Sequence, residues 1–219
     1  MLRPPGHHPF AMDFVRTDHR GRMHDPVRGV PGLRSIDAAR YHCWDQPVFA
    51  PFAGEVLHSA GDWPDHAGTS AWATVQRWYE ATFRFKPVRT EGFIDIRPNA
   101  GNYVMIRGHD GVIAFLAHLR EGSPCVVPGD RVALGAPVGR VGLSGNTTAP
   151  HLHFNLFDQM DDPFEAAVLP FVIDSFAQRS RQGAWERKIA ATPDVGAWVA
   201  FDVSLPDSSE QGRLSSEPG

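Results

Sequence analysis

The sequence lacks the features that mark several large protein classes. It contains two cysteines in 219 residues, too few for a scaffold held together by disulfides. No apolar run approaches the ~20 residues that a membrane-spanning helix needs. The formal net charge is −4, without a long basic block, so binding to nucleic acid through a basic surface is not indicated. We therefore expect a globular protein with no transmembrane segment and no nucleic-acid partner.

The sequence leaves open the redox state of the two cysteines and the cellular compartment of the protein. For Cys43 and Cys125 we favour buried free thiols over a single bridge, whose geometry the sequence does not define. Residues 1–6 lead directly to polar histidines, without the apolar central region of a signal peptide. Either the protein stays in the cytoplasm, or upstream residues that direct it to the periplasm or the outside are missing from this sequence.

Glycine and proline are abundant, with 21 and 19 residues, and they separate short apolar stretches. This punctuation is typical of a β protein with many turns rather than of a helical bundle. Residues 108–111 (GHDG), for example, fit a hairpin turn between two apolar stretches. The predicted fold is mainly β, an antiparallel, sandwich-like sheet domain. Its expected strands cover residues 10–16, 48–57 (two short strands around a turn), 101–107, 112–119, 135–141 and 152–158.

An aromatic insert at about residues 60–98 departs from this pattern. Within it, residues 70–85 have apolar side chains near helical spacing, which predicts a short amphipathic helix. We expect its aromatic stripe to pack on the sheet, and the alternative is a wall of a substrate groove. The stripe consists of Trp72, Val75, Trp78, Tyr79 and Phe83.

The pattern changes again towards the C-terminus. Residues 1–160 are expected to form the main domain, and residues 161–205 a C-terminal extension packed on it. Within the extension, residues 175–188 are polar with a helical pattern, and residues 195–203 predict one last strand. The tail at 206–219 is rich in Ser, Glu, Gly and Pro, and we expect it to be disordered.

His151 and His153 open an apolar, β-favouring stretch that follows a turn-rich segment. Side chains two apart on a strand point to the same face. Imidazole serves both as a zinc ligand and as an acid or base near neutral pH. One strand can therefore place a metal ligand beside a proton-transfer group. Alone, a His-x-His pair is a weak signal, because an ordinary half-buried strand explains it as well.

Other segments supply residues of the same chemistry. His7 and His8 precede Asp13 near the start of a predicted strand, which offers nitrogen and oxygen ligands for a metal. His118 ends a strongly apolar strand, and the turn-dense residues 139–146 favour a tight loop beside a cleft. The remaining histidines lie in predicted loops or turns, where we expect solvated side chains. They are His19, His24, His42, His58, His66 and His109.

In order and in flanking residues, these segments resemble the lysostaphin/LytM-type zinc peptidases. Four stretches carry the resemblance: VFAPFAGEVL at 48–57, GNYVMI at 101–106, HLREGSPCVVPGDRV at 118–132 and GAPVGRVGLSGNTTAPHLHF at 135–154. The resemblance covers roughly residues 6–158, interrupted by the aromatic insert. Such a set of motifs in predicted strand context is far more specific than the histidine pair alone.

The resemblance implies a catalytic Zn²⁺ site. Its ligands would be an N-terminal histidine, Asp13 and His153, and His118 and His151 would be catalytic histidines that do not bind the metal. Three protein ligands and one open position for water are the usual composition of a catalytic zinc site.

The N-terminal ligand departs from the common family spacing, which is His-x-Gly-x-Asp. Here His8 lies five positions and His7 six positions before Asp13. An even separation along a strand keeps two side chains on one face, so we favour His7. A bulge around Pro9 would instead bring in His8.

The function implied by the resemblance is a zinc-dependent endopeptidase that hydrolyses peptide cross-links or stem peptides of bacterial peptidoglycan. A different class of function is a non-catalytic module that binds or activates other cell-wall hydrolases. A third is a peptidase that acts on some other peptide. The sequence defines neither the scissile bond nor the oligomeric state.

Overall fold

The structure is a computed structural model of the chain. It describes residues 8–27, 35–79, 83, 88–90, 93–159, 165–179 and 183–201. The chain divides into two compact units, His8–Leu169 and Met1–His7 together with Pro170–Gly219. Antiparallel strands dominate the described part of both units, which confirms the prediction of a mainly β fold.

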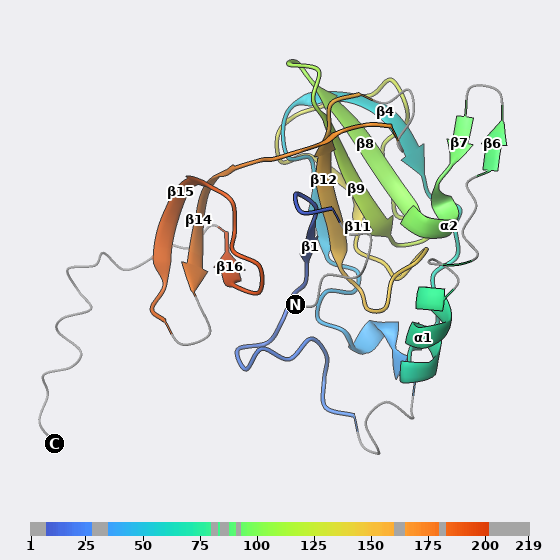
Figure 1. Ribbon diagram of the computed structural model, residues 1–219, viewed down its shortest axis with the longest axis vertical. Helices are drawn as coiled ribbons and strands as arrows, with labels where there is room; N and C mark the ends of the chain where they lie inside the picture. The colour runs from blue at the N-terminus through green and yellow to red at the C-terminus, as the bar shows by residue number, and fades with distance from the viewer. Residues whose placement is uncertain are drawn as a thin grey trace, which may run out of the picture. The chain divides into compact units, whose positions relative to one another are not determined.

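The unit His8–Leu169 is built around a seven-stranded antiparallel sheet (Figure 1). The order along the sheet is β1-β12-β9-β8-β4-β10, and β13 pairs with β12 as well. The strands are β1 (Met12–Phe14), β4 (Gly54–Ala60), β8 (Asn102–Gly108), β9 (Ile113–Leu119), β10 (Arg131–Val132), β12 (Leu152–Phe157) and β13 (Val168–Leu169). β1, from the start of the chain, thus lies beside β12, which contains His153 and directly follows His151.

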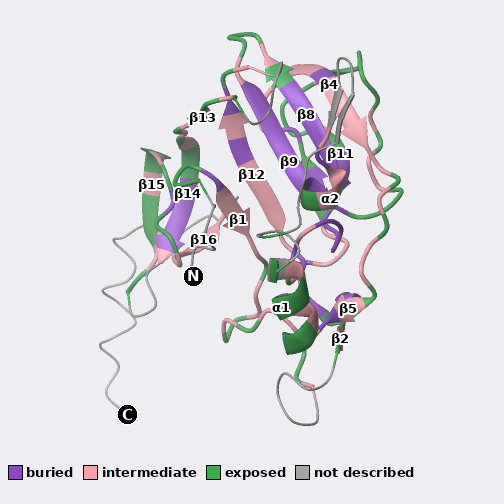
Figure 2. Ribbon diagram, turned by 45° about the vertical axis from the view of Figure 1, so that its right-hand side comes forward, coloured by how far each residue is buried: buried purple, intermediate pink, exposed green. Residues whose placement is uncertain are grey.

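Both faces of this sheet bury apolar side chains, and β8 and β9 are buried along most of their length (Figure 2). On one face, Val104, Ile106 and Leu116 pack with residues of β3 (Pro47–Phe49) and β11 (Pro137–Arg140). On the other face, Tyr103, Met105 and Phe115 form a second cluster. A strand that is buried on both faces has a nearly continuous apolar sequence, which explains the strong strand prediction here.

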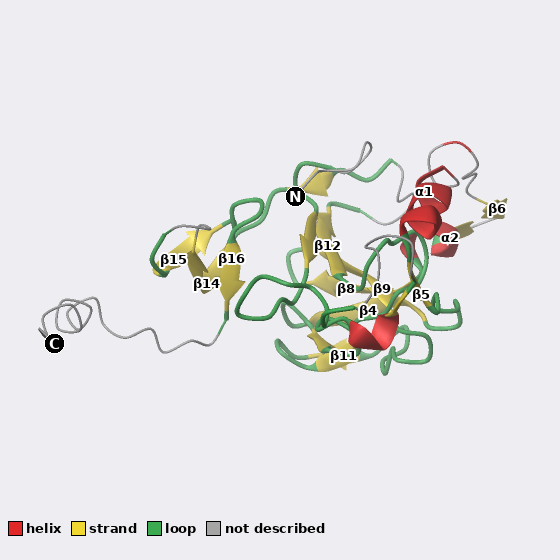
Figure 3. Ribbon diagram, turned by 90° about the horizontal axis from the view of Figure 1, so that it is seen from below, coloured by secondary structure: helices red, strands yellow, loops and turns green. Residues whose placement is uncertain are grey.

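Shorter elements frame the loops at the sheet ends. β2 (Ile36–Asp37) pairs with β5 (Gly68–Thr69), and β6 (Val88–Thr90) pairs with β7 (Phe93–Asp95). β3 pairs with β11. A 3₁₀ turn covers Ala38–Arg40, and the described helices α1 (Ala71–Tyr79) and α2 (Arg97–Ala100) are both short (Figure 3).

Helix α1 forms where the aromatic periodicity predicts it, directly after Ser70. The Ser70 hydroxyl accepts the backbone N–H of Ala73 at 3.1 Å, which caps the first turn. The expected packing of the stripe is wrong, however: Trp72 is 76%, Tyr79 51% and Phe83 64% exposed. The side chain of Trp78 lies outside the described part of the chain. The helix instead turns a small and polar face inward, as described below for Arg77.

The described part of the second unit is a three-stranded antiparallel sheet in the order β15-β14-β16. Its strands are β14 (Ile173–Arg179), β15 (Glu186–Ala191) and β16 (Trp198–Ala200). The helical prediction for residues 175–188 is therefore wrong, whereas the last predicted strand is confirmed. Phe176, Ala177 and Gln178 of β14 are buried, and Gln178 forms hydrogen bonds with Asp194 through both its amide atoms. Packing of this extension on the main domain stays a prediction, and the tail at 206–219 lies outside the described residues.

Both cysteines are free thiols. Cys43 belongs to the first apolar cluster, and burial raises the pKa of its thiol. Cys125 is exposed, so the expectation of free thiols is confirmed but burial holds for Cys43 alone. In the described part of the chain, none of the helices combines the length and the apolar character that a bilayer crossing requires.

Candidate metal centre

His153 lies on β12 and His151 directly precedes this strand, and one ring nitrogen of each lies within 4.8 Å of the other. Register places His153 directly opposite Asp13 of β1. The Nδ1 atom of His153 is 2.9 Å from Asp13 Oδ1, and the Nε2 atom of His151 is 3.4 Å from the same oxygen. Both rings therefore converge on one carboxylate that is 140 positions from His153 in sequence.

His118 reaches this group through a β-bulge at the end of β9. Tyr103 and Asn102, consecutive on β8, pair with Ala117 and Leu119, so His118 is the extra residue of the bulge. Its φ of +60° lies in the left-handed region, which costs on the order of 1–3 kcal/mol for a residue other than glycine. In regular alternation His118 would share the face of Leu116, away from the histidine pair. The bulge turns its ring to the face of His153.

The three imidazoles form a compact cluster. One nitrogen from each of His118, His151 and His153 lies within 4.8 Å of the others. The ring of His118 is 4.8 Å from that of His151 and 5.9 Å from that of His153, measured between centroids. Such a group of nitrogen donors could hold a metal ion.

Hydrogen bonds on the far side of each ring determine which nitrogen faces the cluster. His118 donates Nδ1–H to the carbonyl of Ser144 at 3.0 Å, and His151 donates Nδ1–H to the carbonyl of Ala149 at 2.8 Å. Carbonyls accept only, so Nδ1 of both rings carries a proton and Nε2 is the nitrogen on the side of the cluster. His153 contacts Asn155 Oδ1 through Nε2 at 3.2 Å and Asp13 Oδ1 through Nδ1 at 2.9 Å. Nδ1 is therefore the atom of His153 that faces the carboxylate.

The pair of Asp13 and His153 fits zinc. Two ligands of one tetrahedral zinc, each about 2.1 Å from the metal, are separated by about 3.4 Å. Asp13 Oδ1 and His153 Nδ1 are 2.9 Å apart, so a small outward shift of either side chain reaches that separation. The donor set is one carboxylate and one imidazole, which zinc accepts readily. The residues present therefore suit the metal that the resemblance implies.

The N-terminal ligand stays a prediction. His7 lies outside the described residues. His8 is exposed, and its Nδ1 accepts the backbone N–H of Phe10 at 3.3 Å. His8 is not among the three clustered histidines.

The electrostatics of the cluster favour a neutral His118. Burial lowers the pKa of His118 well below its ordinary value of 6.5, and the neighbouring imidazoles of His151 and His153 lower it further. The carbonyl of Ser144 and the carboxylate of Asp13 oppose this shift without cancelling it. At neutral pH the Nε2 lone pair of His118 is therefore available to take up a proton.

A tight loop supports His118 from behind, where the turn-dense residues 139–146 predict one beside a cleft, but the sequence did not indicate which side chains hold it. Asn102 is fully buried and donates to the carbonyls of Leu119 and Trp63 at 3.1 and 2.7 Å. The Ser144 hydroxyl donates to Leu119 O at 2.6 Å and accepts from Asn102 N at 3.0 Å. One sequence signal could have revealed these contacts of Asn102 and Ser144: both Gly101-Asn102 and Ser144-Gly145 fall within the stretches that carry the resemblance.

His66 is a further correction, because it was expected to be a solvated loop residue. It is partly buried, and its Nε2 donates to the carbonyl of Gly145 at 2.7 Å. Its neighbour Asp65 accepts the backbone N–H of Leu143 at 2.6 Å and that of Glu121 at 2.7 Å. Residues 65 and 66 therefore hold the same loop that carries Ser144.

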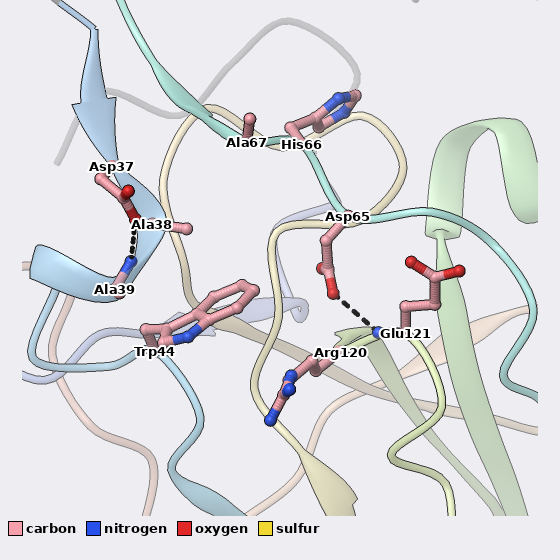
Figure 4. A pocket seen from close by; sticks show the side chains of 9 residues that line it. All are labelled: Asp37, Ala38, Ala39, Trp44, Asp65, His66, Ala67, Arg120 and Glu121. Carbon is pink, nitrogen blue, oxygen red and sulfur yellow. Dashed lines mark hydrogen bonds between the residues drawn. The ribbon is translucent and has the colours of Figure 1, made fainter.

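Beside this loop lies a pocket of about 360 Å³ (Figure 4). The carboxylate of Asp65 forms part of its wall, and the ring of Trp44 projects into it (Figure 4). The guanidinium of Arg120 lies 5.8 Å from the Trp44 ring and pairs with Asp45 at 2.8 Å. The pocket thus adjoins the loop that positions His118, although the three clustered histidines do not line it.

Comparison with known proteins places this geometry in a family. Residues 89–164 match the model of peptidase family M23. Among solved structures, the chain is similar to a mutant catalytic domain of the prophage-encoded M23 protein EnpA from Enterococcus faecalis, with 19% identity over 72% of this chain and 88% of that one, at a TM-score of 0.38. The catalytic domain of the antimicrobial peptidase lysostaphin from Staphylococcus simulans gives 18% identity over 66% and 88%, at 0.36. A zinc-containing peptidase from Vibrio cholerae gives 20% identity over 53% of this chain and 27% of that one, at 0.33. The segment that contains His118, His151 and His153 thus matches the model of peptidase family M23, in agreement with the resemblance to the lysostaphin/LytM-type peptidases.

Proposed function

We propose that this protein is a zinc-dependent endopeptidase that hydrolyses peptide cross-links or stem peptides of bacterial peptidoglycan. The observation that carries the proposal is the convergence of Asp13, His118, His151 and His153 on one side of the sheet. Two rings direct Nε2 and one directs Nδ1 to the same space, because the other nitrogen of each ring contacts an oxygen outside the cluster. The match to family M23 supports the reaction class.

In this proposal Asp13, His153 and the N-terminal histidine, His7 or His8, hold the zinc. The ion supplies a Lewis acid that polarises the scissile carbonyl and lowers the pKa of water. His118, neutral and fixed by Ser144, accepts the proton of the attacking water at Nε2. His118 then passes this proton to the leaving amine, and His151, fixed by Ala149, holds its Nε2 towards the same region and orients the attacking water.

The first test is zinc content by elemental analysis, with cleavage of wall peptides assayed on the same samples. We expect about one zinc per chain in the wild type, and loss of both zinc and cleavage in Asp13→Ala and His153→Ala. His118→Ala and His151→Ala should keep the zinc and lose cleavage. His109→Ala, at an exposed turn, is the matched control and should behave as the wild type.

The same series separates the remaining possibilities. His7→Ala and His8→Ala identify the third ligand, because only the ligating histidine is needed for full zinc content. Zinc without cleavage of any wall peptide would point to another peptide substrate or to a non-catalytic module. A metal-supplied wild type that binds no zinc would contradict the proposal outright.

A further inference from the structure

Arg77 ties helix α1 of the aromatic insert to the loop that carries His151. Its Nη1 donates to the carbonyl of Thr147 at 2.7 Å, and its Nη2 donates to the carbonyl of Gly68 at 3.1 Å. One guanidinium therefore joins α1, β5 and the segment just before His151. Helix α1 precedes residues 89–164, the segment that matches the family model, so this contact is a feature of the insert.

The inner face of α1 is where the helix meets the domain. At 100° per residue, Trp72, Val75 and Tyr79 centre on the helix face opposite Arg77, and these side chains are exposed. Ala73, Thr74 and Arg77 are partly buried on the inner face. The described aromatic side chains of the helix, Trp72 and Tyr79, thus lie on its exposed face. The polar contacts of Arg77 join the helix to the loop.

Hydrogen bonds within the loop connect the main chain held by Arg77 to the ring of His151. Thr147 is buried, and its hydroxyl donates to the carbonyl of Ala149 at 2.8 Å. That carbonyl also accepts Nδ1–H of His151, and the same hydroxyl oxygen lies 3.0 Å from this Nδ1. The other end of the loop is held by Asn146, whose N–H donates to Asn99 O at 2.8 Å. Arg77 therefore fixes the main chain of the residue whose side chain helps to orient the His151 ring.

We propose that Arg77 is a positioning residue for His151, and that the insert helix is thereby part of the catalytic apparatus. The inference rests on the proposed peptidase function. A guanidinium stays charged at all working pH values, so its two bonds to carbonyls persist across the pH range of the reaction. Charge-assisted bonds of this kind are among the stronger ones in proteins, and their fork geometry holds two carbonyls in one arrangement.

The test compares Arg77→Ala, Arg77→Lys and a matched control, Arg107→Ala. Arg107 forms an exposed ion pair with Glu55 at 3.2 Å between β8 and β4, so its loss leaves the loop untouched. For Arg77→Ala we expect unchanged zinc content, a KM within about twofold of the wild type and a kcat lowered about tenfold, equivalent to ~1.4 kcal/mol. Arg77→Lys, which keeps the charge but not the fork, should recover part of kcat.

A second readout needs no turnover. Nitrogen-15 spectra of the imidazoles report whether His151 keeps its proton on Nδ1, and hydrogen exchange reports the protection of amides 145–151. In Arg77→Ala we expect a mixture of His151 tautomers and faster exchange in this loop, with both unchanged in Arg107→Ala. These readouts remain informative even if the wild type cleaves no wall peptide, so failure of the peptidase proposal is distinguishable from failure of this one.

The inference is overturned if Arg77→Ala keeps both the tautomer and the loop protection of the wild type. It is also overturned if kcat falls only in proportion to the unfolded fraction, or if the loss lies entirely in KM. Loss of zinc in Arg77→Ala would assign the residue to the stability of the ligand set rather than to His151.

Discussion

Among the residues of the site, His118 differs most from an ordinary solvated histidine. It is buried, it sits at a positive φ, and its pKa is shifted to well below 6.5. The folded protein therefore takes up a proton on His118 only well below pH 6.5, whereas the unfolded chain does so near that value. Below pH 6.5 the unfolded state binds more protons, so the stability from neutral His118 is complete above pH 6.5 and is lost as the pH falls towards the folded pKa.

This linkage predicts a pH-dependent difference between metal-free wild type and His118→Gln. We expect the wild type to lose more unfolding free energy than the variant between pH 7.5 and pH 5.5, because glutamine has no proton to gain. Urea unfolding at the two pH values measures this change in unfolding free energy. The other titrating groups are common to both proteins. Equal losses in the two proteins would contradict the assigned direction of the His118 pKa.

The backbone of the same residue predicts a second effect. Glycine adopts a positive φ without the penalty of a side chain, so His118→Gly should be more stable than His118→Ala by about 1 kcal/mol. Ala117→Gly, at a regularly paired neighbouring position, should instead be destabilising by about 0.5–1 kcal/mol. Denaturant unfolding of the three variants measures these differences in unfolding free energy. A His118→Ala protein as stable as His118→Gly would show that the bulge relaxes when the imidazole is removed.

At the scale of elements, the site depends on how closely the loop at 141–146 approaches the start of β8. Gly101 has φ +63°, and a Cβ atom there would lie 2.3 Å from Ser144 Oγ and 2.5 Å from Ser144 O. The latter oxygen accepts the Nδ1–H of His118. Any side chain at residue 101 would therefore push away the group that orients the catalytic histidine.

Gly101→Ala is accordingly predicted to lower both stability and kcat. Overpacking of this kind costs about 1–3 kcal/mol, in addition to the strain of a positive φ. Gly111→Ala is the matched control, since Gly111 has φ +86° but open space around its Cβ position, and it should show the backbone strain alone. Thermal unfolding and turnover are the measurements. Equal losses of stability and turnover in the two variants would mean that the loop shifts without disturbing His118.

At the scale of the whole molecule, the described site residues all come from the unit His8–Leu169. The sheet that carries them completes its strand pairing within that unit. The second unit has its own three-stranded sheet and supplies none of the clustered histidines. Zinc binding and catalysis should therefore depend little on residues 170–219.

We predict that a chain ending at residue 169 keeps its zinc and cleaves wall peptides within about threefold of the full chain, a difference of under ~0.7 kcal/mol in the barrier. Elemental analysis and a cleavage assay on purified protein check this, with circular dichroism as the control for folding. A folded, zinc-loaded chain that has lost cleavage would assign the C-terminal unit a direct part in substrate binding.

Sequence alone determined the parts of this protein that depend on local pattern. Continuous apolar runs in β8 and β9 follow from burial on both faces, and the helical spacing of aromatic residues predicts α1. Period-two alternation places His151 and His153 on one face, and the ordered motifs lead to peptidase family M23. Each of these patterns spans residues that are close together in the sequence, so strand and helix periodicities can be counted directly.

Tertiary structure alone decided the rest, because it depends on contacts between distant segments. Alternation would direct His118 to the wrong face, and only pairing with β8 creates the bulge that turns it towards His153. The aromatic face of α1 is exposed, and Arg77 on the opposite face bonds to the carbonyls of Gly68 and Thr147. No helical pattern encodes the position of these carbonyls. Residues 175–179 and 186–188 form strands because pairing across β14 and β15 outweighs local propensity. Asp13 and His153 meet for the same reason: register between strands 140 residues apart is set by the packing of the whole sheet.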